Sequence, residues 1–470
     1  MEPIVADVKF FGLYAPSSSI DSYASLDAHL RAIKATPKNG SGLQKAYQIY
    51  TLGVEDETNG SHTIWRLANR AHIQLEESET IQYLTDFYGL DDFSDKWLMA
   101  AFSTKDDEKT TAFTRGNVNF SSFVGVDARL AAIESGIAAL VFWPYVLGSF
   151  EVAHAKCRVG DTSNSASRQY WDQGVALYAG EQVQTGKGSG SSLFALAEAL
   201  CPVFGKCGEN RAPINTELFE MFRAGQDNLN AGKCDAVKGG VEKIKSLMMV
   251  PLIQGALLSV YAIDKGGHDS YPGSHDSFYP EDALGEAAAF GSAMFPFMIK
   301  CSEGDGQIVE NDMFPQRSKN ASLSVVQAAF ERCYTSFNID SKWIGEIVEK
   351  DAKPNPSPTP MPKALLPNPP SPTSQGSSES VRSQSSPTSS SSSGNTAALI
   401  VGLGCFCAVL LALLILTLKG INNRQRKTKE FLTQHSDSKI VSDAKTGSSS
   451  NAGGGHEDQK EGKASDAEIV

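Results

Sequence analysis

The chain has 470 residues, more than one compact core usually supports, so we expect two domains together with non-globular segments. Its formal net charge of −12 disfavours a nucleic-acid partner, because binding to phosphate backbones requires clustered lysine and arginine. The same charge is compatible with cations as partners, although an acidic surface can also serve only to keep a protein soluble.

Residues 1–350 carry mostly helical patterns. Their apolar residues recur with the spacing of one helix face, and few stretches alternate with the period of two that strands require. We therefore predict a mainly α fold without a large sheet. The run 136–147 is apolar on every side yet too short to span a bilayer, which predicts a buried central helix interrupted near Pro144. The helical patterns cover 21–35, 134–156, 167–178, 193–200, 216–229, 237–263, 283–299 and 323–337.

A weak internal repeat divides this region. His29 precedes a helical segment that carries Tyr50 and ends in glycine, and His154 precedes a segment that carries Tyr178 and ends in the same way. The pattern predicts a duplicated helical ectodomain, with a first unit over 1–120 and a second, longer unit over 121–350.

A single membrane anchor follows the helical region. Residues 351–396 are rich in proline and serine, a composition that cannot bury enough apolar surface to fold, so they predict a disordered stalk. Residues 397–418 carry no charge and as a helix span ~33 Å at ~1.5 Å per residue, which matches the hydrocarbon core. Lysine and arginine follow at once, so the positive-inside rule predicts a cytoplasmic tail over 419–470 and an ectodomain outside the plasma membrane.

Sequons and cysteines agree with this orientation. Asn39, Asn59, Asn119 and Asn320 begin N-x-S sequons, which are glycosylated only outside the cytoplasm. The two cysteines within the apolar span lie too deep for acylation. The six cysteines before the stalk predict up to three disulfides, with several pairings left open: Cys157, Cys201, Cys207, Cys234, Cys301 and Cys333.

The first residues of the sequence carry no recognisable signal for export of the ectodomain. They contain neither a basic n-region nor a long apolar h-region, so we expect that a signal peptide is missing from this start. A cytosolic, tail-anchored protein is the alternative. The long tail, the sequons and the cysteines argue against that class.

Candidate metal ligands come from two helical segments and from their counterparts in the first unit. Glu151 and His154 are three residues apart, so one helix face brings both near a single ion, although a plain surface pair has the same spacing. A second Glu-x-x-His is absent from the sequence, which disfavours a di-iron oxidase. Asp172 and Tyr178 lie ~120° apart around a helix, so Tyr178 is either a ligand or a core residue. The matching first-unit residues are His29 and Tyr50.

These residue types suit ferric iron. Fe(III) is a hard cation that prefers carboxylate and phenolate oxygens and accepts imidazole, and carbonate could complete its coordination. Arg168 is a candidate anchor for that anion, or else a solvated charge. A Gly/Pro-rich loop around His268 and His275 could chelate metal or serve as an exposed connection. The sequence contains no nucleophile elbow, Walker A loop or H-E-x-x-H motif, so we expect a binding protein and not an enzyme.

Several phrases resemble one family. The segment 170–180, YWDQGVALYAG, is similar to a signature of the algal low-iron-inducible periplasmic proteins, and its departures are Gln173 for an acidic residue and Leu177 for phenylalanine. Further similar phrases are DFSDKW at 92–97, CPVFGKC at 201–207 and VPLIQG at 250–255. With its stalk and anchor, the chain most resembles the diatom phytotransferrins.

The resemblance implies carbonate-dependent, high-affinity capture of ferric iron at the cell surface, followed by internalisation through endocytic adaptors that bind the tail. A stalked glycoprotein for adhesion or wall attachment is the alternative with the same architecture, and a helical surface metalloenzyme is a third. Iron uptake by the ectodomain in the presence of bicarbonate distinguishes the first from the second.

Overall fold

The computed structural model describes residues 10, 13–54, 67–68, 75–103, 112–123, 125–159, 165–184, 190–208, 211–266, 280–315 and 321–348. The predicted stalk, transmembrane helix and tail lie outside the described residues, as do Asn59, Asn320 and the loop with His268 and His275. Residues up to Lys363 belong to one compact unit, so the predicted boundary between 120 and 121 lies inside it.

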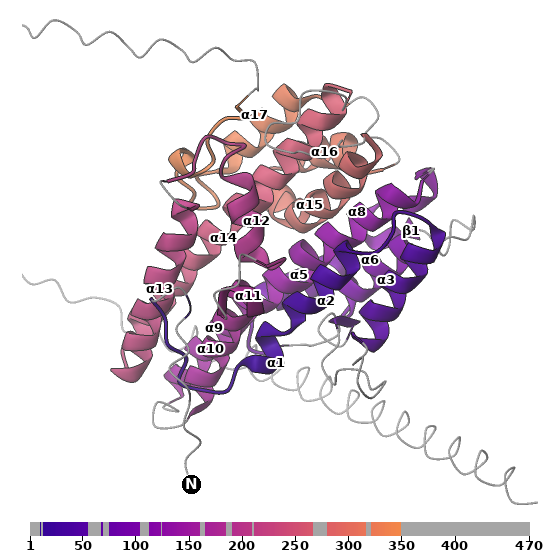
Figure 1. The fold of residues 1–470 in the computed structure, drawn as a ribbon. Coiled ribbons are helices and arrows are strands. Elements are labelled where there is room, and N and C mark those ends of the chain that lie inside the picture. The colour runs from indigo at the N-terminus through magenta and orange to yellow at the C-terminus, as the bar shows by residue number, and fades with distance from the viewer. Residues whose placement is uncertain are drawn as a thin grey trace, which may run out of the picture. The chain divides into compact units, whose positions relative to one another are not determined.

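The described part of this unit is mainly α, as predicted (Figure 1). Its only strands there pair as one short antiparallel ribbon, β1 with β2. The elements are α1 (Asp21–Ala24), α2 (Leu26–Lys34), α3 (Gly40–Leu52), α5 (Glu79–Tyr88), α6 (Phe93–Phe102), β1 (Ala112–Phe113), η1 (Thr114–Gly116), β2 (Val118–Asn119), η2 (Phe120–Ser122), α8 (Val126–Gly136), η3 (Ile137–Phe142), α9 (Trp143–Arg158), α10 (Ser165–Ala179), α11 (Glu181–Gln184), α12 (Leu193–Leu200), α13 (Pro213–Asn230), α14 (Cys234–Asp264), α15 (Pro280–Cys301), α16 (Glu303–Met313), α17 (Leu323–Cys333) and η5 (Ser341–Trp343).

A continuous run of α8, η3 and α9 forms the centre of the unit, with α15 packed on α8 and α10 packed on α9. This confirms the buried central helix expected at 136–147. Pro144 does not end the helix: η3 is a π-helical segment directly before it. Because Pro144 has no N–H, the carbonyl of Leu140 loses its helical donor, and the Ser94 hydroxyl donates to it at 2.6 Å instead.

The same compensation occurs in α15. Pro296 lies inside that helix and frees the carbonyl of Ser292, which accepts a hydrogen bond from the Tyr88 hydroxyl at 2.7 Å.

Two helical runs of the described residues, Val126–Arg158 and Cys234–Asp264, are long and apolar enough to cross a bilayer. Their apolar windows are 83% and 94% buried within the unit, so packing in the core accounts for their apolar composition.

Three disulfides join all six cysteines that precede the stalk. Cys157–Cys234 connects the end of α9 to the start of α14, Cys301–Cys333 connects α15 to α17, and Cys201–Cys207 closes a short loop after α12. The predicted number of disulfides is confirmed, and the structure supplies the pairing.

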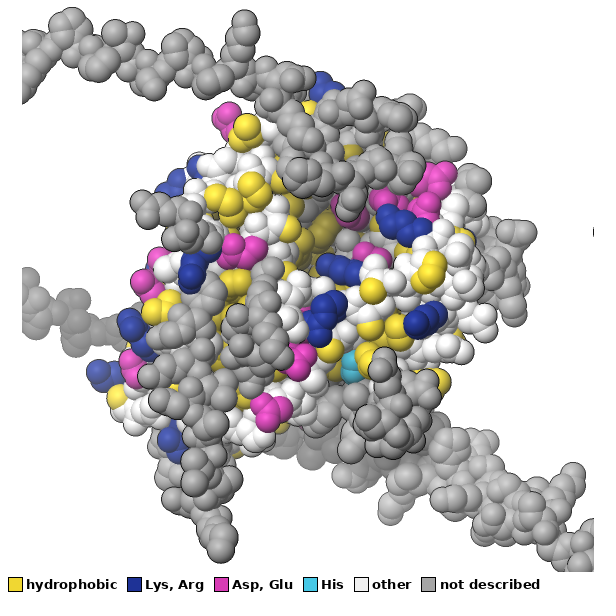
Figure 2. All heavy atoms as spheres, in the orientation of Figure 1, with side chains coloured by type: hydrophobic (Ala, Val, Ile, Leu, Met, Phe, Trp, Pro, Cys, Tyr) yellow, Lys and Arg dark blue, Asp and Glu magenta, His cyan; other side chains and the backbone are white. Residues whose placement is uncertain are grey.

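Charged side chains of both signs lie on one face of the unit. Figure 2 shows acidic and basic side chains interspersed on the face seen in Figure 1. On this face the described acidic side chains therefore do not form a large patch of one sign.

Candidate functional site

Glu151, a predicted ligand, holds the start of α5. Its carboxylate accepts hydrogen bonds from the Ser78 hydroxyl at 2.5 Å, the Thr80 hydroxyl at 2.6 Å and the Thr80 backbone N–H at 3.0 Å. Ser78 is also the N-cap of α5. A carboxylate at a helix N-terminus satisfies free N–H groups and interacts favourably with the helix dipole. The side chain therefore has a structural role that its spacing to His154 did not reveal.

His154 lies beside Glu151 in a pocket of about 330 Å³. Burial, together with Arg158 and Lys238, lowers the pKa of this imidazole from its usual range, and Glu79 and Asp235 oppose the shift. Among the residues described, its Nε2 atom is buried and has no hydrogen-bond partner. Of the four ligands predicted in the second unit, only Glu151 and His154 share a pocket.

Asp172 is the centre of a different network and is fully buried. Its carboxylate accepts from the Ser17 backbone N–H at 2.8 Å, the Ser17 hydroxyl at 2.9 Å and the Ser18 hydroxyl at 2.8 Å. The Tyr14 hydroxyl and the Gln226 amide donate as well. Tyr14, Ser17 and Ser18 anchor the segment before α1 to α10, Gln226 donates from α13, and together the donors occupy both carboxylate oxygens.

The predicted tyrosine ligands are core residues. The Tyr178 hydroxyl donates to Asn215 at 2.5 Å, and the Tyr50 hydroxyl donates to Asp95 at 2.9 Å. Burial raises the pKa of both phenols, with smaller contributions from Glu198 at Tyr178 and from Asp95 at Tyr50. A phenol with a raised pKa gives up its proton to a metal less readily.

His29 and Arg168 lie apart from these networks. His29 is buried on α2, and desolvation lowers its pKa to about 4. Arg168 donates to Asn230 at 3.4 Å, where α10 meets the end of α13.

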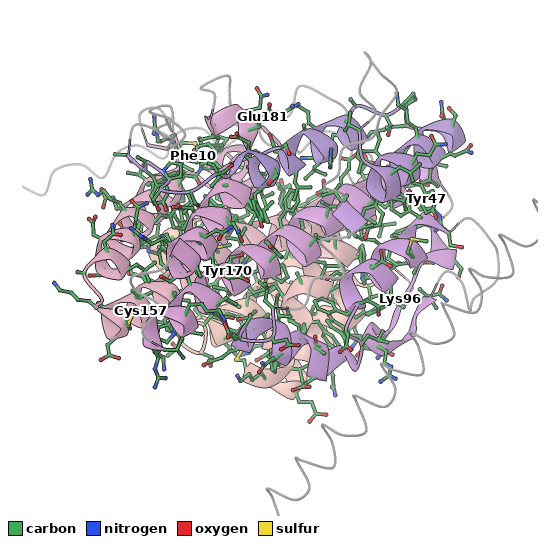
Figure 3. The ribbon with its side chains drawn as sticks, turned by 90° about the horizontal axis from the view of Figure 1, so that it is seen from below. Phe10, Tyr47, Lys96, Cys157, Tyr170 and Glu181 are labelled. Atoms are coloured by element: carbon green, nitrogen blue, oxygen red, sulfur yellow. A yellow bond between two sulfur atoms is a disulfide. The ribbon has the colours of Figure 1, made fainter. Side chains whose placement is uncertain are left out.

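The predicted ligands thus do not converge on one point. Figure 3 shows how far apart two of the helices concerned lie: Tyr47 on α3, the helix of Tyr50, is on one side of the unit, and Cys157 on α9, the helix of Glu151 and His154, is on the other. Within the described ranges no three His, Cys, Asp or Glu side chains form a ready set of metal ligands. The common pocket expected for Glu151, His154, Asp172 and Tyr178 is therefore not formed, because α10 turns Asp172 and Tyr178 towards different neighbours. Their role as ligands stays a prediction.

A second group of oxygen donors lies where α8 and α15 meet. It consists of four carboxylates, here called the acidic cluster: Asp127, Glu134, Asp282 and Glu286. The first two are seven residues apart on α8 and the last two are four apart on α15, so each helix presents both of its carboxylates on one face.

Gly285 allows the two helices to approach closely. A Cβ atom on Gly285 would lie 2.1 Å from the Ala128 carbonyl oxygen and 2.7 Å from the Ala132 nitrogen, so only glycine fits there. The acidic cluster is thereby drawn together across a backbone contact. In Figure 2, acidic and basic side chains lie next to one another in the area where Figure 1 places α2, α8 and α15.

Two lysines face the acidic cluster. Lys38, in the connection between α2 and α3, donates to Oδ2 of Asp282 at 2.7 Å. Burial lowers the pKa of Lys38, but the hydrogen bond and the charge of Asp282, with Glu134 and Asp127, outweigh this effect and raise it. Lys34 on α2 acts on Glu134 and Glu286 through its charge. Four carboxylates against two lysines leave the site net negative when all are ionised.

Burial and mutual repulsion perturb the carboxylates. Burial raises the pKa of Glu286 to about 7, and Asp282 and Glu134 add to the shift, whereas Ser259 and Lys34 oppose it. Burial also raises the pKa of Glu134, which Lys34 and Lys38 counteract. In the part of the chain that is described, the buried Oδ1 atoms of Asp127 and Asp282 have no hydrogen-bond partner. Unpartnered buried oxygens of this kind are costly unless a ligand satisfies them.

Comparisons with known proteins add no relative. No family model, no curated protein and no solved structure matches the chain.

Sequence reasoning missed the acidic cluster because its halves are far apart in the chain. One signal was present: Glu286 interrupts an alanine-rich helical segment whose other residues are small or apolar. A carboxylate in such a segment is rare unless it has a partner.

Proposed function

We propose that this chain is a cell-surface protein that binds ferric iron and is not a catalyst. The observation that carries the proposal is the pair of buried carboxylate atoms without a partner in the acidic cluster, Oδ1 of Asp127 and Oδ1 of Asp282, although the described carboxylates do not form a metal-holding group as they stand. Hard trivalent cations prefer such donors. All six cysteines of the unit lie in disulfides, so none of them offers a thiolate that would favour a softer metal.

Three further observations support a surface location. Disulfides persist in oxidising compartments outside the cytoplasm. The span 397–418 is long and apolar enough to anchor the chain, with basic residues on its tail side. The phrases at 92–97, 170–180, 201–207 and 250–255 resemble the phytotransferrins, which implies carbonate as a second ligand and internalisation through the tail. Arg168 lies apart from the acidic cluster and would hold carbonate only at a distance from it. Lys34 and Lys38 are therefore better placed to hold a carbonate ion beside the proposed iron site.

Equilibrium dialysis of the full chain in detergent tests the proposal. Ferric iron is supplied as its citrate complex, with and without bicarbonate. We expect one ferric ion per chain when bicarbonate is present. The double variant Asp282→Asn with Glu286→Gln should lose this binding, whereas a matched double variant of exposed residues on α13, Asp227→Asn with Glu220→Gln, should keep it. A wild-type chain that takes up no iron would refute the proposal and favour an adhesive role.

A further inference from the structure

Two of the four N-x-S sequons begin at described residues, Asn39 and Asn119. Asn39 lies in the turn between α2 and α3, where residues 37–41 are exposed without interruption. Asn119 ends β2 and is half-buried, and Phe120, the middle residue of its sequon, is fully buried. The two sequons therefore differ in how much of the acceptor tripeptide the folded chain leaves accessible.

The Asn39 amide caps α3 through its oxygen. Oδ1 accepts hydrogen bonds from the Gly42 backbone N–H at 3.0 Å and from the Ser41 hydroxyl at 2.7 Å. Because a backbone N–H can only donate, the amide atom that faces it is the oxygen, and Nδ2 is the other arm of the amide. Both side-chain hydrogen bonds that Asn39 makes to described residues end on Oδ1. Nδ2 can therefore carry a substituent without loss of the cap.

The surroundings of the two sequons differ as well. A Cβ atom on Gly40, the middle residue of the first sequon, would meet nothing within 4 Å outside its own turn of helix. Ser41 is exposed, so the hydroxyl that a sequon requires two residues after the asparagine is accessible too. Phe120, in contrast, packs edge-on against the Trp97 ring, with 4.9 Å between the ring centroids. An enzyme can bind the second sequon as an open tripeptide only before this contact forms.

We propose that Asn39 carries an N-linked oligosaccharide and that its occupancy exceeds that of Asn119. This inference rests on the surface location in the proposed function and is independent of the iron site. In the transfer, Nδ2 of Asn39 bonds to the anomeric carbon of the donor, an oligosaccharide on a polyprenyl diphosphate of the secretory pathway. The bond from that carbon to the diphosphate oxygen breaks, the diphosphate leaves with the electron pair, and Nδ2 gives up one proton.

Folding produces the difference between the two sites. Transfer to Asn119 competes with the burial of Phe120, whereas the tripeptide that begins at Asn39 stays accessible before and after the chain folds. N-linked oligosaccharides are bulky and solubilising. A glycan on Asn39 therefore also keeps other macromolecules away from the turn between α2 and α3.

Peptide mapping of the full chain tests the inference. The chain is produced behind a secretory leader in a eukaryotic cell line, purified in detergent and digested with trypsin. Because trypsin cleaves after lysine and arginine, Asn39 falls in the peptide 39–45 and Asn119 falls in the peptide 116–129. Mass spectrometry gives the glycosylated fraction of each peptide. We expect most copies of the peptide 39–45 to carry a glycan, and a smaller fraction of the peptide 116–129.

Two variants separate the glycan from the helix cap. Ser41→Ala removes the hydroxyl that transfer requires and keeps the Asn39 cap, whereas Asn39→Asp keeps a capping oxygen and has no acceptor nitrogen. On a gel, each should lose the mobility shift of one glycan, and Ser41→Thr should migrate with wild type. Ser121→Ala, the matched change in the second sequon, should shift a smaller fraction of the chain. Treatment with an N-glycosidase should bring all of these chains to the same mobility.

The outcomes distinguish this inference from the proposed iron site. A chain recovered at the cell surface whose peptide 39–45 is unmodified, or whose occupancy at Asn119 equals or exceeds that at Asn39, would overturn the inference. Iron uptake by the same preparation is measured separately by dialysis. A chain with a glycan on Asn39 and no bound iron refutes the iron site and leaves the inference standing, and an iron-binding surface chain without this glycan does the reverse.

Discussion

The Asp172 carboxylate anchors the segment before α1, and Asp172→Asn measures what this anchor contributes to stability. Asparagine keeps one acceptor oxygen but turns an amide NH2 towards donors that now bind the carboxylate: the Ser17 N–H at 2.8 Å, the Ser17 hydroxyl at 2.9 Å and the Ser18 hydroxyl at 2.8 Å. Net contributions of hydrogen bonds to a charged group are about 1.5–3 kcal/mol each. These three donors share Oδ2, and Tyr14 and Gln226 share Oδ1, so at least two bonds are lost whichever oxygen the amide nitrogen replaces. We therefore expect a decrease of about 4 kcal/mol or more in the free energy of unfolding.

Urea denaturation followed by tryptophan fluorescence is the assay. Trp171 is the neighbouring residue and is fully buried, so its emission reports on this region. The midpoint should fall while the slope of the transition stays unchanged, because the same surface becomes exposed. Asp227→Asn, an exposed residue on α13, should change stability by less than about 0.5 kcal/mol. A loss below about 1 kcal/mol for Asp172→Asn would show that the donors around this carboxylate do not stabilise the fold as argued.

Three further predictions concern other parts of the molecule. Because the folded-state pKa of Glu286, about 7, exceeds the ordinary value of 4.5, the folded chain binds more protons than the unfolded chain between these pH values. The contribution of Glu286 to the free energy of unfolding is about 3 kcal/mol below pH 4.5 and is lost as the pH rises to 7. Between these pH values, a plot of the urea midpoint against pH should therefore be flatter for Glu286→Gln than for wild type. Disulfide removal should cost about 4 kcal/mol at Cys157–Cys234, which encloses 77 residues, and about 2 kcal/mol at Cys201–Cys207, which encloses 6, as thermal unfolding of serine variants can measure. His154→Gln should leave ferric iron affinity in the dialysis assay unchanged, because His154 lies in a pocket apart from the acidic cluster. A loss of iron binding in this variant would instead indicate that the site lies on α9.

Long helices were predictable because their apolar faces repeat over many turns. All eight predicted helical segments overlap helices, but the interruption predicted near Pro144 is wrong and the segment 323–337 extends past the end of α17 at Cys333. The helices α5, α6 and α16 were missed, although α12 and α17 are no longer and were predicted, so helix length alone does not explain the outcome. Local signs of two of these helices were present, since Ser78 and Ser302 each cap a helix with acidic residues in its first turn.

The candidate site was harder to predict because spacing along one helix does not say what the opposite face contacts. The i, i+3 relation of Glu151 and His154 is real, but the partners of Glu151 are the hydroxyl and N–H groups that begin α5. The acidic cluster depends on packing between α8 and α15, which includes the close contact at Gly285. Such a juxtaposition belongs to tertiary structure, and periodicity carries no signal for it.

The position of bound ferric iron is the measurement that bears most directly on the account. Crystals of the iron-loaded chain, recorded at the iron absorption edge, give an anomalous difference map in which the metal is the dominant peak. We expect that peak between α8 and α15, within coordinating distance of Asp282 and Glu286. A peak beside Glu151 and His154, or beside Asp172 and Tyr14, with the acidic cluster unchanged, would contradict it.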